Sequence, residues 1–410
     1  MRNSDYYPAT LNHPPEGPIK IQIKSLLAGL LLALSFSAFS GDADIRSVLF
    51  DTVGAVDSFQ WAPDRYENSF KYDIFYYIPK SINQNTKVGA LIFNHGGGTS
   101  TMDRAGSINV VNMYMPDLKR MADELGIIVV LPSANGLNWG GHTRGFIRDL
   151  GRLMRKELNI DVDRLGLSGH SMGGMGITRS YSWIADEFAF FLPMAAGMDV
   201  NHQTEQHLNK QFNVPYVHLQ GRGDHFEIFI TRCEEQLKRT KDLEVLYGQS
   251  SKLEMIFYYG GHKYDFALFK ANLNKLFTKS PRNLYQKELW GSLHTVHLKN
   301  LENNITYDYD SEARYFWVEA TETDLTTPER IDFHAKIDEN VIRIDMPVAP
   351  KMSKGLKLYL HSSMVDLNQK VEVLLNGKLV ATREAKAGVL RIMDVNDSGF
   401  KFEDTIDIKL

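Results

Sequence analysis

The sequence predicts an α/β fold with a mostly parallel sheet and helices on both faces, followed by a C-terminal β-sandwich. Strand-like and helix-like runs alternate between about Ser69 and Phe277, and beyond them strand runs follow one another closely. Strands that alternate with helices favour a parallel sheet, because each helix returns the chain to the same edge. We expect one domain at 41–285 and a second at 286–410, joined at Ser280–Asn283.

The composition is that of an ordinary folded protein. The chain has 410 residues, of which 43% are hydrophobic and 23% charged, and its net charge is −4. These values exclude a disordered chain and a polytopic membrane protein, and they give no electrostatic reason to expect nucleic acid as a partner. Cys233 is the single cysteine, so an intramolecular disulfide and a cysteine-only zinc site are excluded.

Residues 1–40 are typical of a secretory signal peptide. Basic Lys24 precedes an apolar run that is shorter than the roughly 20 residues of a membrane span. The run ends with small residues at Ala38 and Ser40, the third and first positions before Gly41. We therefore expect cleavage near Ser40 and an exported protein, periplasmic or extracellular, that meets the membrane only during export. An uncleaved N-terminal anchor is the alternative.

The individual elements follow from apolar runs and their spacing. Apolar residues at helical spacing predict helices around Leu118–Leu125 and Ile147–Leu158, with another after Ser171. Short apolar runs predict the strands of the first part at 72–78, 88–93, 127–131, 164–167, 188–194, 216–219 and 255–259. Further runs predict an antiparallel sandwich with strands at 314–320, 330–337, 341–346, 356–361, 371–375 and 378–383. Asn376-Gly377 predicts a tight hairpin, since both residues tolerate positive φ.

The strongest chemical signal is Gly169-His-Ser-Met-Gly-Gly174, which follows a predicted strand and precedes a predicted helix. In a G-x-S-x-G turn of this kind, the serine is held on a strained backbone with its hydroxyl exposed above the sheet. Glycines two residues to either side avoid collisions with neighbouring segments. The segment predicts that Ser171 is a nucleophile, and the alternative is a glycine-rich turn without chemistry.

A second signal is His95-Gly-Gly-Gly98, directly after a predicted strand. Acyl transfer places negative charge on a carbonyl oxygen, and preformed backbone N–H donors stabilise that charge. We expect Gly97 and Gly98 to contribute one donor of such an oxyanion hole and Met172, just after the nucleophile, the other. His95 lies upstream of the serine, so we expect it to hold the loop by hydrogen bonds and not to act as a base.

A nucleophilic serine needs a base, and the base needs an orienting carboxylate, in the chain order serine, acid, histidine. Asp224 follows the strand at 216–219 and His262 follows the strand at 255–259. Both leave the carboxyl end of a strand, where open α/β sheets place their sites. We expect Asp224 to orient His262, and His262 to take the proton of Ser171.

Other residues compete for these roles. Asp199 is the rival acid, and His225 and His218 are rival bases that do not follow the last strand. Asp265 is too close to His262 in sequence for the required arrangement.

No metal-binding or nucleotide-binding motif stands in the sequence, so we expect neither a metal nor a cofactor. Cys233 lies in a polar, helix-like segment, which favours an incidental role. Tyr315-Phe316-Trp317 would suit a sugar-stacking surface, but packing in the core is the favoured interpretation.

Residues 70–277 resemble the α/β-hydrolase superfamily, near its polyhydroxybutyrate depolymerase and feruloyl esterase-like branch. The resemblance lies in 95–98, Leu131-Pro132, 169–174, 221–224 and 260–262. It implies an α/β-hydrolase catalytic domain at 41–285 and a secreted serine esterase that needs no cofactor. The β-rich tail is similar to accessory domains that follow such hydrolases.

The sequence thus favours an exported serine hydrolase that cleaves small-molecule or polymer carboxylic esters through an acyl-enzyme. A serine peptidase similar to the prolyl-oligopeptidase-like enzymes remains open, since the same three side chains cleave amides. A carbohydrate- or polymer-binding protein with an inactive hydrolase domain also remains open. The retained set of Ser171, Asp224 and His262 argues against it.

Overall fold

The protein is described by a computed structural model. Two expectations lie outside the described residues, namely the signal peptide at 1–40 and Gly98 of the oxyanion loop. The described residues are 49–61, 72–97, 103–134, 139, 143–295, 314–323, 329–348, 350–351, 353–385, 393–395 and 399–410.

The first part of the chain forms an eight-stranded sheet with the order β1-β2-β4-β3-β5-β6-β7-β8. Strand β2 pairs antiparallel with β1 and β4, and the other pairs are parallel. The mostly parallel sheet expected from the sequence is confirmed. Its strands are β1 (Val56–Trp61), β2 (Tyr72–Tyr77), β3 (Val88–Asn94), β4 (Ile128–Pro132), β5 (Ile160–His170), β6 (Phe190–Met194), β7 (Tyr216–Gly221) and β8 (Leu253–Tyr258).

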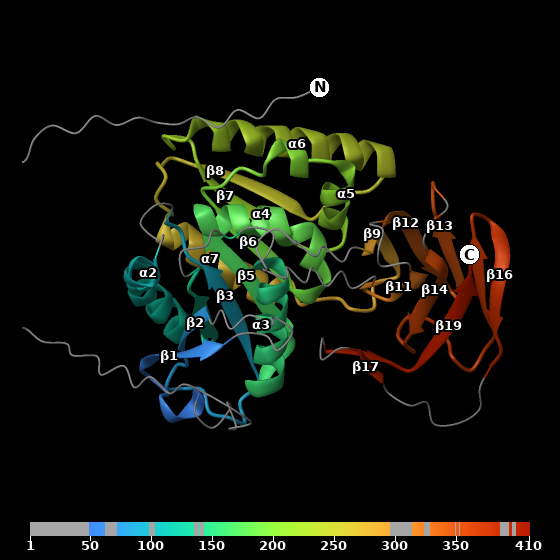
Figure 1. The fold of residues 1–410 in the computed structure, drawn as a ribbon, viewed down its shortest axis with the longest axis horizontal. Coiled ribbons are helices and arrows are strands. Elements are labelled where there is room, and N and C mark those ends of the chain that lie inside the picture. The colour runs from blue at the N-terminus through green and yellow to red at the C-terminus, as the bar shows by residue number, and fades with distance from the viewer. Residues whose placement is uncertain are drawn as a thin grey trace, which may run out of the picture. The chain divides into compact units, whose positions relative to one another are not determined.

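Helices cover both faces of this sheet (Figure 1). Successive residues of a strand point to opposite faces, so Leu91 of β3 packs in the core with α2 and α7, while Ile92 packs in the core with α3 and α4. The longer helices are α2 (Arg104–Leu125), α3 (Thr143–Glu157), α4 (Met172–Ile184), α6 (Glu227–Tyr247) and α7 (Phe266–Lys279). The short ones are η2 (Ala185–Glu187), η3 (Val200–His202), α5 (Glu205–Leu208) and η4 (Asn209–Phe212). Among the described residues, no helix is both long enough and apolar enough to span a bilayer.

The tail forms a β-sandwich, with sheets in the orders β10-β11-β14-β19 and β16-β15-β13-β12-β9 and a small β17-β18 pair. Along β12, Ile331, Phe333, Ala335 and Ile337 alternate inward with more exposed residues, as a sandwich strand requires. The strands are β9 (Glu288–Thr295), β10 (Arg314–Tyr315), β11 (Val318–Thr323), β12 (Glu329–Asp338), β13 (Val341–Asp345), β14 (Ser353–Leu360), β15 (Val371–Leu375), β16 (Lys378–Arg383), β17 (Met393–Val395), β18 (Phe400–Phe402) and β19 (Asp404–Lys409).

Two features of the sandwich differ from the sequence prediction. The run 314–320 is not one strand, because Phe316 takes a φ of 52° and the chain folds back between β10 and β11. The pair β13–β15 is parallel and not antiparallel, since the chain crosses to β14 in the other sheet before it returns. The hairpin at Asn376-Gly377 is confirmed, with φ values of 47° and 78°.

Buried polar contacts join the tail to the first part of the chain. The Asn213 amide donates to the Tyr315 hydroxyl at 2.9 Å, and the Phe316 N–H donates to the Asp186 carboxylate at 3.1 Å. The Lys210 Nζ donates to the Ser292 carbonyl at 3.1 Å and lies 3.7 Å from the centre of the Tyr315 ring. Burial lowers the pKa of Lys210 to about 7. We call this set of contacts the tail junction.

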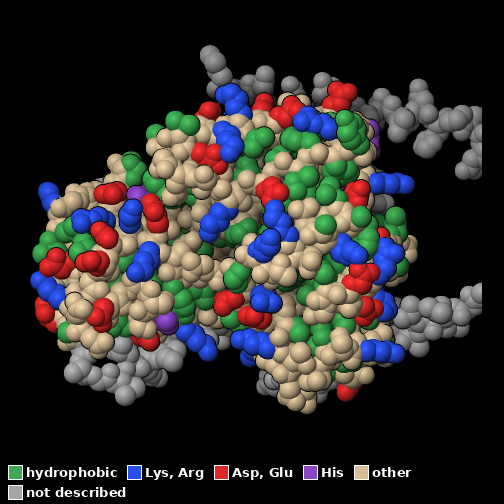
Figure 2. Space-filling view, turned by 180° about the vertical axis from the view of Figure 1, so that it is seen from behind, with side chains coloured by type: hydrophobic (Ala, Val, Ile, Leu, Met, Phe, Trp, Pro, Cys, Tyr) green, Lys and Arg blue, Asp and Glu red, His purple; other side chains and the backbone are tan. Residues whose placement is uncertain are grey.

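One continuous cluster of buried apolar side chains extends through the tail junction. It includes Ile177 and Tyr181 of α4 together with Tyr315, Phe316 and Trp317 of the tail. The last three are at most 3% exposed, which confirms that they pack in the core. On the outer surface, Lys and Arg side chains are interspersed with Asp and Glu side chains over the face shown in Figure 2.

Candidate active site

The turn between β5 and α4 holds Ser171 in a strained conformation. Its φ is 53° and its ψ is −116°, a region that residues with a side chain rarely adopt. The Ser171 N–H donates to the Met194 carbonyl at 2.9 Å, which holds the turn against β6. A Cβ on Gly173 would lie 2.0 Å from the Asn94 carbonyl oxygen. The glycine is therefore required by the close approach of β3 to the start of α4.

The loops after β7 and β8 are bound to each other. The Gly223 N–H donates to the Gly260 carbonyl at 2.8 Å. A Cβ on Gly221 would lie 2.5 Å from that same carbonyl oxygen, so only glycine lets the two backbones approach so closely. The loop that carries Asp224 and the loop that carries His262 thus form one unit.

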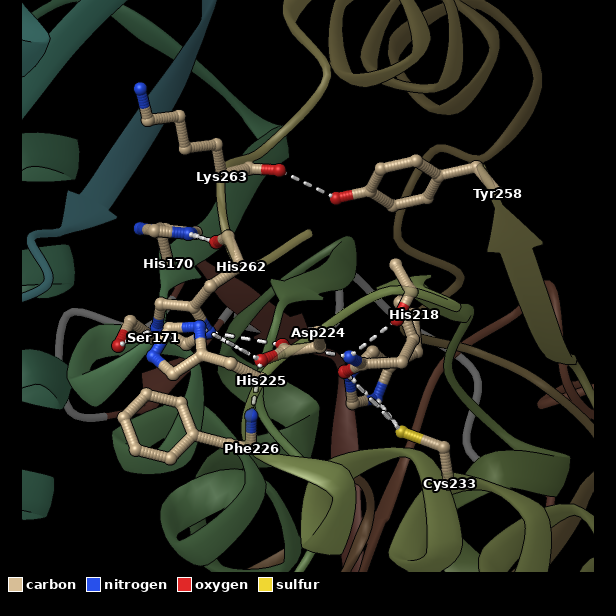
Figure 3. Close-up of polar contacts among 12 residues, drawn as sticks. His170, Ser171, His218, Asp224, His225, Phe226, Cys233, Tyr258, His262 and Lys263 are labelled. Carbon is tan, nitrogen blue, oxygen red and sulfur yellow. Dashed lines mark hydrogen bonds and ion pairs between the residues drawn. The ribbon is translucent and has the colours of Figure 1, made fainter. Parts of the chain in front are cut away.

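The structure brings together Ser171, His262 and Asp224, the three residues expected to form a catalytic triad (Figure 3). The Ser171 Oγ lies 2.7 Å from His262 Nε2, and His262 Nδ1 lies 2.9 Å from Asp224 Oδ2 and 3.1 Å from Oδ1. A carboxylate can only accept, so Nδ1 carries the proton and Nε2 is left to accept from the serine hydroxyl. The Asp224 side chain is fully enclosed, whereas 18% of the His262 side chain is exposed.

The surroundings of Asp224 favour its charged form. Burial by itself would raise the pKa of this carboxyl, but hydrogen bonds from His262, the Phe226 N–H and the Gln220 amide hold the pKa below its usual value. The Phe226 N–H donates to Oδ1 at 2.9 Å and Gln220 Nε2 donates to Oδ2 at 3.0 Å. Asp224 is therefore an anion that fixes both the orientation and the tautomer of His262.

The rival acids have other partners. Asp199 caps η3 by accepting the Asn201 N–H at 3.0 Å, and its carboxylate lies 3.3 Å from the Arg232 guanidinium. Asp265 caps α7 by accepting the Leu268 N–H at 2.9 Å.

The rival bases are also placed elsewhere. The side chain of His225 is 67% exposed, and its Nδ1 lies 3.9 Å from Asp224 Oδ1, beyond hydrogen-bond distance. His218 is fully buried in β7 with Cys233 Sγ 3.6 Å from its Nε2 (Figure 3). Burial lowers the pKa of His218 to about 3 and raises that of the Cys233 thiol, so both are neutral.

Two sources of backbone N–H groups flank Ser171. Met172 is the first residue of α4, and the first N–H groups of a helix point away from its body. On the other side, a Cβ on Gly96 would lie 3.2 Å from the Ser171 Cβ, so the glycine loop after β3 approaches the serine closely. Gly97 follows with a φ of 155°, while Gly98 is outside the described residues.

His95 holds that loop and is not a base. Its Nδ1–H donates to the Gly96 carbonyl at 2.6 Å, and its Nε2 accepts the Ala134 N–H at 3.0 Å. The His95 carbonyl accepts from the Trp139 indole at 2.9 Å. Burial lowers the pKa of His95 to about 4, which keeps the ring neutral. The structural role expected from the sequence is confirmed.

Three residues of the site were not foreseen from the sequence. His170 and Tyr114 form a buried hydrogen bond next to Ser171, and Phe226 places a 45% exposed ring 4.9 Å from the His262 ring. Each stands in a segment whose pattern indicates only a turn, a helix face or a loop. Within the described part of the chain, no group of three or more His, Cys, Asp or Glu side chains could hold a metal ion.

Comparisons with known proteins show a partial similarity to a curated esterase. The chain is 32% identical over 157 residues to the bifunctional acetylxylan esterase/xylanase XynS20E of Neocallimastix patriciarum, a match that covers 37% of this chain. The chain spans only 21% of the length of that relative. No protein-family model matches the chain.

Several solved structures are similar to this one. A thermostable esterase aligns with a TM-score of 0.44 at 16% identity, over 57% of this chain and 64% of its own. A ferulic acid esterase aligns with a TM-score of 0.41 at 18% identity, over 55% and 98%. The poly(3-hydroxybutyrate) depolymerase LpqC from Bordetella parapertussis aligns with a TM-score of 0.44 at 15% identity, over 58% and 94%.

The fold is settled by the topology of the sheet and the position of the serine. A single antiparallel strand, β2, stands between β1 and β4, and the serine turn follows β5 at the carboxyl edge of the sheet. The candidate acid and base follow β7 and β8 in the chain order serine, acid, histidine. The chain therefore has the α/β-hydrolase fold, followed by a β-sandwich tail.

Proposed function

We propose that the protein is a serine hydrolase that cleaves carboxylic esters through an acyl-enzyme intermediate. The observation that carries the proposal is the continuous hydrogen-bonded series from Ser171 Oγ through His262 to Asp224, with heavy-atom distances of 2.7 Å and 2.9 Å. Such a series lets a neutral serine hydroxyl attack a carbonyl carbon, because the proton has an acceptor already in place.

In the first half-reaction, Ser171 Oγ bonds to the ester carbonyl carbon while its proton passes to His262 Nε2. The carbonyl oxygen becomes an oxyanion, which the backbone N–H groups of Met172 and of Gly97 or Gly98 would stabilise. The bond to the alcohol oxygen then breaks, and His262 returns the proton to that oxygen. The alcohol leaves, and the acyl group remains on Ser171.

In the second half-reaction, a water molecule replaces the alcohol. His262 takes one proton from the water, whose oxygen bonds to the acyl carbon. Collapse of this second tetrahedral intermediate breaks the bond to Ser171 Oγ, and His262 returns the proton to the serine. A carboxylic acid is released and the free enzyme is restored. Asp224 stays ionised throughout and stabilises the imidazolium in both halves.

The curated relative supports esters as the substrate class. That protein is described as an acetylxylan esterase and xylanase. An acyl group on a small molecule or on a polymer is thus the substrate that we propose.

The test is a substrate panel on the purified protein and on Ser171→Ala. We expect the protein to hydrolyse p-nitrophenyl acetate and butyrate, and a serine-directed phosphonate to add one phosphonyl group at Ser171, as peptide mass spectrometry would show. Ser171→Ala should lose both reactions. Turnover of aminoacyl p-nitroanilides in preference to esters would instead indicate the peptidase. Absence of both turnover and labelling in the folded wild type would leave only the binding protein.

Export is a second part of the proposal and rests on the pattern within residues 1–40. We propose that the chain is cleaved near Ser40 and acts outside the cytoplasm. N-terminal mass spectrometry of the secreted protein should start near Gly41. A secreted or membrane-bound protein that retains residue 1 would contradict cleavage.

A further inference from the structure

We propose that His170 and Tyr114 act as a positioning pair. The pair fixes the position of the loop that carries His262, residues 259–265, relative to Ser171 and to the glycine loop after β3. We call residues 259–265 the base loop. Neither residue would touch the reacting atoms. The proposal rests on the proposed function of Ser171 and His262, and it adds two residues from β5 and α2 to the machinery of that site.

His170 binds the backbone of the base loop. Its Nε2 lies 2.6 Å from the carbonyl oxygen of His262 (Figure 3). A carbonyl oxygen can only accept, so Nε2 must carry the proton of the His170 ring. His170, which directly precedes Ser171, therefore holds the main chain of His262, the proposed base of Ser171.

Tyr114 fixes the tautomer that this contact needs. Its hydroxyl lies 2.7 Å from His170 Nδ1. With the ring proton on Nε2, Nδ1 has a lone pair and accepts from the Tyr114 O–H. The Tyr114 O–H therefore adds to the preference that the His262 carbonyl already gives for a proton on Nε2.

The same hydroxyl also reaches the oxyanion loop. The Gly96 backbone acts on the Tyr114 oxygen and partly offsets the rise that burial causes in the pKa of Tyr114. A Cβ on Gly96 would lie 2.7 Å from that oxygen, so the loop packs directly against it. One buried tyrosine thus links the glycine loop after β3 to His170 on β5, and through His170 to His262 after β8.

The pair is buried and uncharged. His170 is 8% exposed and Tyr114 is 9% exposed. Burial lowers the pKa of His170 to about 4 and raises that of Tyr114 to about 12, so neither titrates near neutral pH. The groups that face His170 are Tyr114, the His262 ring at 5.3 Å, the Tyr264 ring at 5.5 Å and, as a weaker charge effect, Asp224.

A second anchor holds the same loop to α2. The Tyr264 ring stacks on the Tyr114 ring with centroids 5.8 Å apart and planes 20° apart. The Tyr264 hydroxyl donates to the Asp117 carboxylate at 3.0 Å. The base loop is therefore held at Gly260 by the loop after β7 and at Tyr264 by α2. The His170 contact acts on His262, which lies between these two points.

Three substitutions test the pair. His170→Leu removes the donor to the His262 carbonyl, while His170→Gln keeps an N–H donor of similar reach. Tyr114→Phe removes only the hydroxyl that fixes the tautomer. Tyr181→Phe is the matched control, because Tyr181 is a fully buried tyrosine outside the site, and its hydroxyl has no hydrogen-bond partner among the described residues.

We expect His170→Leu to lower kcat and the rate of phosphonate labelling by about 10²-fold, because small misplacements of a reacting group cost this much, with KM little changed. Tyr114→Phe should lower both rates by about tenfold on the same argument. His170→Gln should restore most of the rate, and Tyr181→Phe should match the wild type. If the pair had a merely structural role, the substitutions would lower the melting temperature but would not lower kcat while leaving KM unchanged.

A folded His170→Leu that labels at the wild-type rate would overturn the proposal, and so would a fully active Tyr114→Phe. If His170→Leu does not fold, a comparison of the labelling rates of Tyr114→Phe and Tyr181→Phe decides. An NMR readout needs no activity: the downfield proton on His262 Nδ1 should be sharp in the wild type and His170→Gln and broadened in Tyr114→Phe. A wild-type protein that shows this signal but is not labelled would refute the proposed ester hydrolase and would leave the positioning pair standing.

Discussion

Asp224 and Asp199 both follow central strands, yet their surroundings fit them for different tasks. Asp224 is enclosed and bonded to His262, whereas Asp199 caps η3 and pairs with Arg232. We expect Asp224→Asn to lower kcat by about 10⁴, as in other triads, because the amide favours the wrong tautomer of His262. Asp199→Asn is the matched control and should keep kcat within a few-fold of the wild type. Steady-state rates on p-nitrophenyl acetate distinguish them, and the reverse ranking would move the role of acid to Asp199.

Three buried histidines should make the fold sensitive to acid. Burial lowers the pKa of His95 and His170 to about 4 and that of His218 to about 3, against an ordinary value of 6.5. Below pH 6.5 the unfolded chain binds protons that the folded chain does not, so stability falls as pH drops toward 4. Each histidine contributes up to about 1.4 kcal/mol per pH unit in that window.

The measurement is the free energy of unfolding in urea at pH 7.5, 6.5, 5.5 and 4.5. We expect little change from these groups above pH 6.5 and a steep loss below it. His218→Gln should reduce the slope, because glutamine does not titrate. A stability that stays level down to pH 4.5 would show that these rings are protonated in the fold.

The sequence was informative for residues whose chemistry is tied to a motif. Ser171, Asp224 and His262 could be predicted, because each follows a strand in a fixed chain order. His170 and Tyr114 could not. The position before Ser171 is unspecified in the G-x-S-x-G pattern, and Tyr114 stands on an ordinary buried helix face. Their contact joins residues 56 apart and exists only once the sheet has formed.

The start of α4 shows how an element depends on a missing side chain. The Asn94 carbonyl oxygen would lie 2.0 Å from a Cβ on Gly173, and it belongs to the backbone, which moves less readily than the end of a side chain. We expect Gly173→Ala to displace β3 or the serine turn and to abolish phosphonate labelling, although alanine is the better helix former by about 1 kcal/mol.

Gly151→Ala in α3 is the matched helical control. A Cβ there would meet only side chains, at 3.3 Å from Leu165 and 3.5 Å from Phe188, and these can adjust. Labelling should then persist at close to the wild-type rate. If Gly173→Ala labels as fast as Gly151→Ala, the close approach to Asn94 is not essential.

Elements with long apolar runs could be predicted, and elements held by long-range pairing could not. Strand β1 was missed, because Phe59 is its only buried residue and polar residues interrupt its pattern. The two-residue turn at Phe316 was missed, since no glycine or asparagine marks it. The parallel pair β13–β15 depends on a strand in the opposite sheet, which local patterns do not report.

The whole molecule depends on the tail junction. A chain that ends at Tyr285 keeps all three candidate catalytic side chains but loses the partners that Lys210, Asn213 and Asp186 have in the tail. Removing the tail also exposes to water the apolar side chains, such as Tyr181, that pack in one cluster with the tail. We expect the shortened chain to melt at a lower temperature and to aggregate in size-exclusion chromatography.

The control is Lys370→Ala, which removes an exposed ion pair with Glu372 in the tail and should leave melting unchanged. A shortened chain that is monomeric and melts like the full chain would mean that the part up to residue 285 folds independently of the tail. The domain boundary expected from the sequence at residue 285 would then separate two parts that are stable independently of each other.

The unbroken apolar cluster across the tail junction has a consequence for cooperativity. Because Tyr181 on α4 and Tyr315 in the tail belong to one cluster, neither part can melt without exposing the other. Calorimetry should show one heat-absorption peak with equal calorimetric and van't Hoff enthalpies, whereas two resolved peaks would contradict this coupling. A substitution in the sandwich, far from Ser171, would then limit how long the proposed hydrolase stays active at high temperature.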